Sequence, residues 1–145
     1  MGLNRILMKA NGSTIEGDGK FIMTMGQHGS QYGFSRWGGN FGEVTGNVKH
    51  DGRAVTLVML SYSSAGGYLD FAFNVEGVTG GRYNVTVKVT SVETNTSVTI
   101  EFPDIQYQSY VPGFYEYTNS LPSDVARMFS SANVGKKFKV EIIFN

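Results

Sequence analysis

The amino-acid sequence predicts an all-β fold, either a single antiparallel β-sandwich or a jelly-roll-like barrel, with one short helix near the C-terminus. Composition is the first observation. Glycine supplies 19 of the 145 residues and charged residues only 17%, which favours tight turns over long solvated helices. In the second half of the chain, apolar and polar residues alternate with a period of two, as in half-buried strands. The short strands recur at intervals of about 8–15 residues, which is typical of sandwiches and barrels.

In the first half of the chain, the alternation of apolar and polar residues is less regular than in the second half. Short apolar runs at residues 6–8 and 21–25 predict two strands. Because a glycine-rich stretch follows the first run, residues 1–19 form a candidate N-terminal arm that adds a strand to a neighbouring subunit. Frequent glycines after residue 33 predict bulges and ordered loops. No linker divides the sequence, so we expect residues 1–145 to form one domain.

Residues 53–102 predict a meander of about four antiparallel strands. Apolar side chains occupy every second position of 69–75 and again of 83–89, with polar side chains between them. Three of the five residues in the segment 77–81 are glycine, which predicts a hairpin turn between these two strands.

The other elements of the second half follow from local pattern. Residues 55–60 are apolar on both parities, which predicts a strand that is covered on both faces or crosses between sheets. Residues 98–102 predict a further hairpin arm, which we expect Pro103 to end because proline has no N–H for the ladder. Residues 122–131 predict the single helix, with proline and aspartate in its first turn. Residues 138–144 alternate again and predict the last strand.

Charge and cysteine content argue against several classes of protein. Twelve basic and twelve acidic residues give a net charge of zero, so no global field attracts nucleic acid or an anionic membrane. The absence of cysteine excludes disulfides, thiolate metal sites and a thiol nucleophile. No apolar run is long enough for membrane insertion. The N-terminus lacks the apolar core of a signal peptide, so we expect synthesis in the cytoplasm.

No arrangement of residues predicts catalysis or a metal site. His28 and His50 lack a second ligand at metal-binding spacing. Residues 33–38 approach the Gly-x-Ser-x-Gly nucleophile elbow, but the last glycine comes one residue late. Asp70 and Glu76 share one strand parity, and we interpret them as carboxylates on a solvated face in preference to a glycosidase pair. We therefore expect no enzyme activity, no cofactor and no metal.

Two groups of aromatic residues fall outside the predicted strands. Aromatic rings offer a flat apolar face, and tyrosine and tryptophan add a polar group, which suits a protein interface or a sugar. The alternative is that the rings pack under long loops as satellite cores. The candidate interface or glycan-binding residues are Tyr32, Phe34, Trp37 and Phe41 in the first group, and Tyr107, Tyr110, Phe114, Tyr115 and Tyr117 in the second.

Several short motifs resemble small β-rich modules of tailed-bacteriophage tail, fibre and baseplate proteins. The run at residues 21–26 is followed by Tyr-Gly-Phe-Ser at 32–35 and Phe-Gly-Glu-Val at 41–44. Later pieces are also similar, namely Tyr-Leu-Asp-Phe at 68–71 and Gly-Lys-Lys-Phe-Lys-Val at 135–140. The motifs extend over most of the chain, and the family carries no catalytic residues to transfer.

The resemblance implies a non-enzymatic virion structural protein, located in the tail, fibre or baseplate after synthesis in the host cytoplasm. Its partners would be other virion subunits, and we expect docking as a homo-oligomer. Zero net charge agrees with self-association, because it removes repulsion between copies. The alternative from another class is a carbohydrate-binding, lectin-like module that recognises a host-surface glycan, with Trp37 and either Tyr110 or Tyr115 stacked on a sugar ring.

Overall fold

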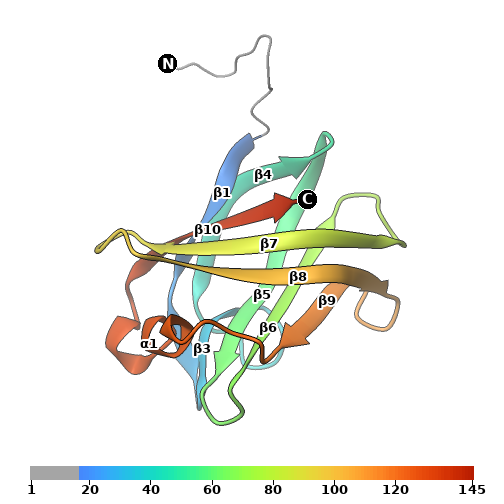
Figure 1. Cartoon of the computed structure of the whole chain (residues 1–145). Coiled ribbons are helices and arrows are strands. Elements are labelled where there is room, and N and C mark those ends of the chain that lie inside the picture. Colours follow the sequence, from blue (N-terminus) through green and yellow to red (C-terminus); the bar gives the residue numbers. More distant parts are fainter. Residues whose placement is uncertain (1–16) are drawn as a thin grey trace, which may run out of the picture.

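Every strand pairing in residues 17–145, which the computed structural model describes, is antiparallel (Figure 1). This confirms the predicted all-β class. The expected strand at 6–8 and most of the candidate arm at 1–19 lie outside the described residues. The strands are β1 (Gly17–Thr24), β2 (Gly26–His28), β3 (Gln31–Ser35), β4 (Glu43–His50), β5 (Arg53–Ser63), β6 (Tyr68–Val75), β7 (Arg82–Ser91), β8 (Ser97–Gln108), β9 (Gly113–Thr118) and β10 (Lys137–Phe144).

The pairings close eight of these strands into a ring in the order β5, β4, β1, β10, β7, β8, β9 and β6. The ring closes because β5 pairs with β4 at its beginning and with β6 along most of its length. The predicted hairpin over 77–81, and with it the continuous meander over 53–102, is wrong, because β6 pairs with β5 and β9 whereas β7 pairs with β8 and β10. The second half of β5 pairs with β3 in place of β4, and β2 pairs with the other edge of β3, so the β2–β3 hairpin extends the wall. A closed ring removes most of the free strand edges that an open sheet would expose.

The core fills the inside of this ring. The predicted alternation is confirmed in β7 and β8, since Val87 and Ile100 are buried while Lys88 and Glu101 are exposed. Phe71, Phe73 and Phe102 form a connected set of rings with centroids 4.9–5.2 Å apart. Such offset aromatic contacts add to the apolar burial that stabilises the barrel.

Strand β5 is covered on both faces, as its apolar sequence predicts. Leu57 and Leu60 belong to the main core, whereas Val58 and Met59 pack outside the ring with Ala72. The pairing with β6 shifts register between Leu57 and Met59. The bulge places two consecutive residues, Val58 and Met59, on the same outer side opposite Ala72. A second, smaller core therefore lies on the outer wall.

The prediction that Pro103 ends its strand is wrong, because β8 continues to Gln108. The register with β7 shifts between the pair Val85–Phe102 and the next pair, so Pro103 and Asp104 lie in a bulge. Asp104 has a φ of 60°, and its N–H donates to Asn84 Oδ1 at 2.8 Å. Proline is tolerated at a bulge because the ladder needs no N–H there.

The predicted C-terminal helix is present but shorter than residues 122–131. Helix α1 spans Asp124–Met128 and is followed by the 3₁₀ turn η1 (Ser131–Asn133). Its apolar residue Val125 and the following Phe129 are fully buried in the main core, so this segment packs against one end of the ring (Figure 1). Among the described residues, no helix has the length and apolar character needed to cross a membrane.

Candidate functional site

Most of the candidate aromatic residues lie on strands, which corrects the expectation that both groups fall in loops. Tyr32 and Phe34 belong to β3, Tyr107 to β8, and Phe114, Tyr115 and Tyr117 to β9. Only Trp37, Phe41 and Tyr110 lie outside the strands. In β9 aromatic side chains occupy both faces of the strand, and in β3 a glycine interrupts the alternation. Neither segment therefore shows the period of two that indicates a strand.

Five of the nine candidates are core residues. Phe34, Phe41 and Phe114 are buried, with Phe41 stacked on the His28 ring. Tyr32 and Tyr107 are partly buried against the main core. For these five, packing in or against the core, as in the satellite-core alternative, describes the contacts that the structure shows.

The other four candidates, Trp37, Tyr110, Tyr115 and Tyr117, lie on the outside of the ring. The Trp37 ring meets the Tyr115 ring edge-on, with centroids 5.8 Å apart. Both rings pack over the outer core of Val58, Met59 and Ala72. Tyr110, in the turn between β8 and β9, is near enough to Tyr115 to raise its pKa. The fold thus brings the two predicted groups together.

Local hydrogen bonds hold Trp37 in place. Ser35 Oγ donates to the Trp37 carbonyl oxygen at 2.7 Å, and Trp37 N–H donates back to Ser35 Oγ at 3.0 Å. Ser35 is itself buried and pairs with Phe41 across the loop. Gly38 and Gly39 follow with positive φ, which closes the loop back onto the barrel wall.

The register between β6 and β9 adds two residues to this surface. Asp70 lies opposite Tyr117, and Ala72 lies opposite Tyr115. Tyr68, two residues before Asp70, therefore shares the outer face and meets Tyr117 edge-on at 5.9 Å. Tyr68, Asp70, Tyr115 and Tyr117 line a hollow of about 360 Å³, which we call the tyrosine pocket. We call Trp37, Tyr68, Tyr110, Tyr115 and Tyr117 together the outer aromatic surface.

A hydrogen bond between Tyr115 and Asp70 sets the electrostatics of the tyrosine pocket. Tyr115 Oη donates to Asp70 Oδ1 at 2.8 Å. Burial raises the pKa of the Asp70 carboxyl, and this hydrogen bond partly offsets the rise. Burial, followed by the hydrogen bond to Asp70 and its negative charge, raises the pKa of the Tyr115 phenol well above its usual value. Within residues 17–145, no Lys, Arg or His forms an ion pair with Asp70.

Sequence reasoning noticed Asp70 but missed its surroundings. It placed Asp70 with Glu76 on a solvated face, and the outer face is confirmed for Asp70. The two carboxylates have separate partners, however, because Glu76 Oε1 accepts the Ala54 N–H at 3.3 Å while Asp70 is half-buried under Tyr115. Tyr68 was not identified. Tyr68 lies two residues before Asp70, so the two side chains share one face of the strand. This indicates a common site only once β9, with Tyr115 and Tyr117, is known to pair with β6.

The other residues considered for chemistry have structural contacts. Ser35, at the near miss to a nucleophile elbow, uses its hydroxyl on the Trp37 backbone. His50 stacks on Phe144 with centroids 4.0 Å apart and meets Tyr83 edge-on. No group of three or more His, Asp or Glu side chains within residues 17–145 has an arrangement that could hold a metal ion.

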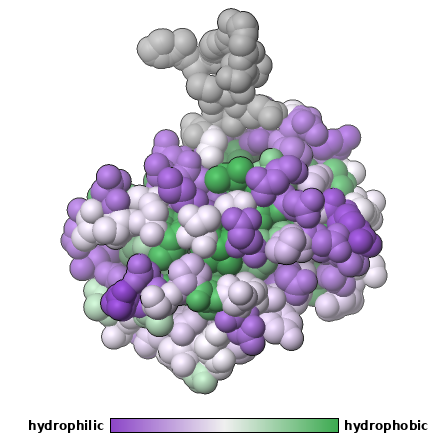
Figure 2. Space-filling model, in the orientation of Figure 1, coloured by the Kyte–Doolittle hydropathy of each residue, from purple (hydrophilic) through white to green (hydrophobic). Residues whose placement is uncertain are grey.

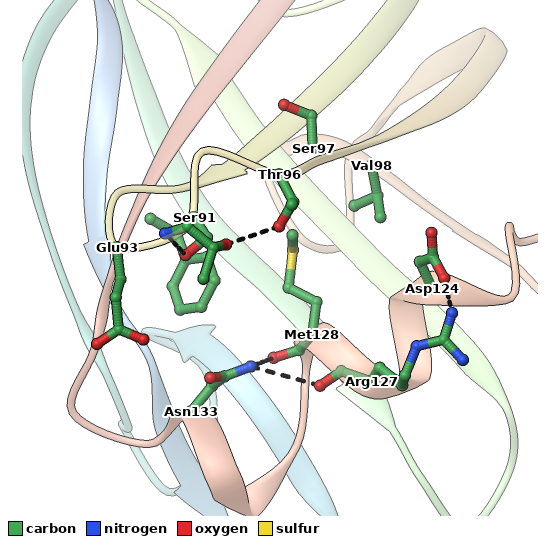
Figure 3. A pocket seen from close by; sticks show the side chains of 11 residues that line it. Ser91, Glu93, Thr96, Ser97, Val98, Asp124, Arg127, Met128 and Asn133 are labelled. Carbon is green, nitrogen blue, oxygen red and sulfur yellow. Dashed lines mark hydrogen bonds and ion pairs between the residues drawn. The ribbon is translucent and has the colours of Figure 1, made fainter.

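A second hollow, of about 290 Å³, lies between α1 and the hairpin of β7 and β8 (Figure 3). Its polar side chains are largely used within the protein. Arg127 pairs with Asp124, and Asn133 Nδ2 donates to the Met128 carbonyl oxygen at 2.8 Å. These contacts tie the helix to the following turn, so the hollow is best described as a structural feature of the barrel end.

Comparison with known proteins finds no matching family model, and neither curated proteins nor solved structures include a significant match.

Proposed function

We propose that this protein is a non-enzymatic structural subunit of a bacteriophage virion, in the tail, fibre or baseplate, which docks to neighbouring subunits as a homo-oligomer. The observation that carries the proposal is the outer aromatic surface. Tyr110 and Tyr117 are 74% and 57% exposed, although tyrosine usually covers much of its ring in a folded protein. Adjacent exposed aromatic rings are enriched at protein interfaces and often supply their strongest contacts.

The rest of the molecule supports a docking role. Tyr68, Tyr115 and Tyr117 of the outer aromatic surface lie on paired strands, so binding at this part of it would require little ordering of the chain. On the face shown in Figure 2, hydrophobic residues gather near the middle and hydrophilic residues surround them, a distribution that is typical of interfaces. The resemblance of several sequence motifs to phage tail modules is the reason for proposing that the partners are virion subunits. Of the two predicted architectures, the closed ring favours the barrel over the sandwich.

Light scattering over a range of protein concentrations tests the proposal. We expect a fixed mass that corresponds to a trimer or larger ring. The double variant Tyr110→Ser/Tyr117→Ser should lower this mass, because it removes two exposed rings without touching the core. The control Val92→Ser/Val134→Ser removes exposed apolar residues elsewhere and should leave the mass unchanged. A monomer at every concentration would contradict the proposal.

Glycan recognition is the second candidate function, and the exposure of Tyr110 favours it. A ring that is 74% exposed can stack on a sugar. Trp37 is less suited to stacking than the sequence predicts, because it is half-buried and meets Tyr115 edge-on. A glycan panel with wild type, Tyr110→Ala and Trp37→Ala separates the two functions. Sugar binding that Tyr110→Ala abolishes without changing the oligomer mass would favour recognition of a host glycan.

A further inference from the structure

We propose that the tyrosine pocket is a cation site, which receives the side chain of a lysine or arginine on a docking subunit. The identity of this occupant rests on the docking function proposed above. The affinity of the pocket for an organic cation does not depend on it. Two observations carry the inference, namely a half-buried carboxylate that forms no ion pair with the described residues and the tyrosine rings that line the pocket with it.

The carboxylate of Asp70 is half-buried without a cation. Its one described hydrogen bond comes from Tyr115, a neutral donor. The five ion pairs of the described residues all involve other carboxylates. Buried carboxylates in proteins are usually paired with a cation, because burial disfavours the charged form. An incoming ammonium or guanidinium group would compensate this charge.

Three tyrosine rings line the tyrosine pocket together with Asp70. Tyr68 and Tyr117 have an interplanar angle of 70°, and Trp37 stands at 62° to Tyr115. A sugar-binding platform needs a flat exposed face, which rings that meet edge-on do not offer. Because tyrosine rings and the Asp70 carboxylate line the same pocket, a cation bound there would gain both cation–π attraction and an ion pair.

The single tryptophan of the chain provides a measurement at this point. Trp37 contacts Tyr115, which lines the pocket, so its fluorescence should report on occupancy. The probes are the N-acetyl amides of lysine and arginine, with the matching amides of norleucine and citrulline as neutral analogues of similar shape. Glucose serves as the sugar probe.

We expect saturable fluorescence changes with the lysine and arginine probes, and none with the neutral analogues or glucose. Added salt should weaken binding. Asp70→Asn, which keeps the shape of the side chain, should lower the affinity at least about tenfold. Tyr117→Leu should lower it through loss of a ring. The control Asp104→Asn removes an exposed carboxylate that pairs with Arg82 and should bind like wild type. Thermal melts of each variant exclude loss of the fold as the cause.

Specific outcomes overturn the inference. They are no saturable change with either cation, equal binding of arginine and citrulline probes, unchanged affinity in Asp70→Asn, or displacement of the cation by glucose. The oligomer mass of Asp70→Asn separates this inference from the docking function. If the protein binds the cation but is a monomer at every concentration, the cation site is supported and the docking function is contradicted. If Asp70→Asn has the wild-type oligomer mass, the docking function stands, but the tyrosine pocket is not its contact.

Discussion

The Tyr115 hydroxyl donates a 2.8 Å hydrogen bond to the Asp70 carboxylate, which joins two residues that lie 45 positions apart in the chain. On its other side, the Tyr115 ring contacts Trp37 and the outer core. Tyr115 is therefore the residue at which the loop after β3, strand β6 and strand β9 meet. Tyr115 thus connects the tyrosine pocket to the outer core and to the loop that carries Trp37.

Tyr115→Phe should lower the free energy of unfolding by about 1–2 kcal/mol. The variant keeps the ring over the outer core but leaves the half-buried Asp70 carboxylate without its described hydrogen-bond donor. Urea denaturation followed by circular dichroism measures the loss. Tyr110→Phe, at an exposed position, is the matched control and should differ from wild type by less than about 0.5 kcal/mol. Equal stability of the two variants would contradict the structural role of the bond.

The raised pKa of Asp70 predicts a pH-dependent effect of Asp70→Asn. In the unfolded chain this carboxyl titrates near its usual value of 3.8, and in the folded protein its pKa is higher. Ionisation therefore opposes folding: the opposition is absent below the unfolded pKa and reaches its full size as the pH rises through the folded pKa. We expect Asp70→Asn to be more stable than wild type at neutral pH, by less than about 1 kcal/mol, with the difference shrinking in acid. Urea denaturation of wild type and Asp70→Asn at neutral and at acidic pH tests this. A variant that gains relative stability in acid would contradict the sign.

The loop that carries Trp37 should depend on Ser35. Ser35→Ala removes both hydrogen bonds to the Trp37 backbone and should cost about 1–2 kcal/mol of stability. Trp37 fluorescence should shift to longer wavelength as its ring becomes more exposed. Ser64→Ala is the control, because its exposed hydroxyl donates only to the Ser30 carbonyl oxygen. An unchanged spectrum in Ser35→Ala would show that packing alone positions Trp37.

Gly42 should be essential to the irregular first half of the barrel. It has a φ of +73°, and a Cβ there would collide with the Gly33 carbonyl oxygen. Gly42→Ala should therefore destabilise the protein by more than about 2 kcal/mol. Gly29 also has positive φ but open space around it, so Gly29→Ala should cost only about 1 kcal/mol. Denaturation midpoints compare the two. Equal losses of stability in the two variants would mean that the positive φ determines the cost and that the contact with the Gly33 carbonyl oxygen adds nothing to it.

Local periodicity was sufficient for the regular part of the fold. The alternation of Val85, Val87 and Val89 predicted β7 and its buried face, and the apolar run before Leu60 predicted a strand covered on both sides. The helix near the C-terminus was predicted because Pro122 and Asp124 are typical of a first helical turn. These signals are local, since each depends on residues within one strand or one turn.

The tertiary structure alone decided the rest. Pro103 reads as a strand end, but the bulge opposite Asn84 allows β8 to continue. Nothing in the sequence near Trp37 indicates that Tyr115 will cover it, because the same alternation is compatible with many strand orders and registers. Pairing of β6 with β9 determines which rings share a face with Asp70. The sequence by itself determined regular strands such as β6, β7 and β10 and their inward faces, because alternation is a local signal. The ring closure and the register determined the surface at which we propose that the protein binds.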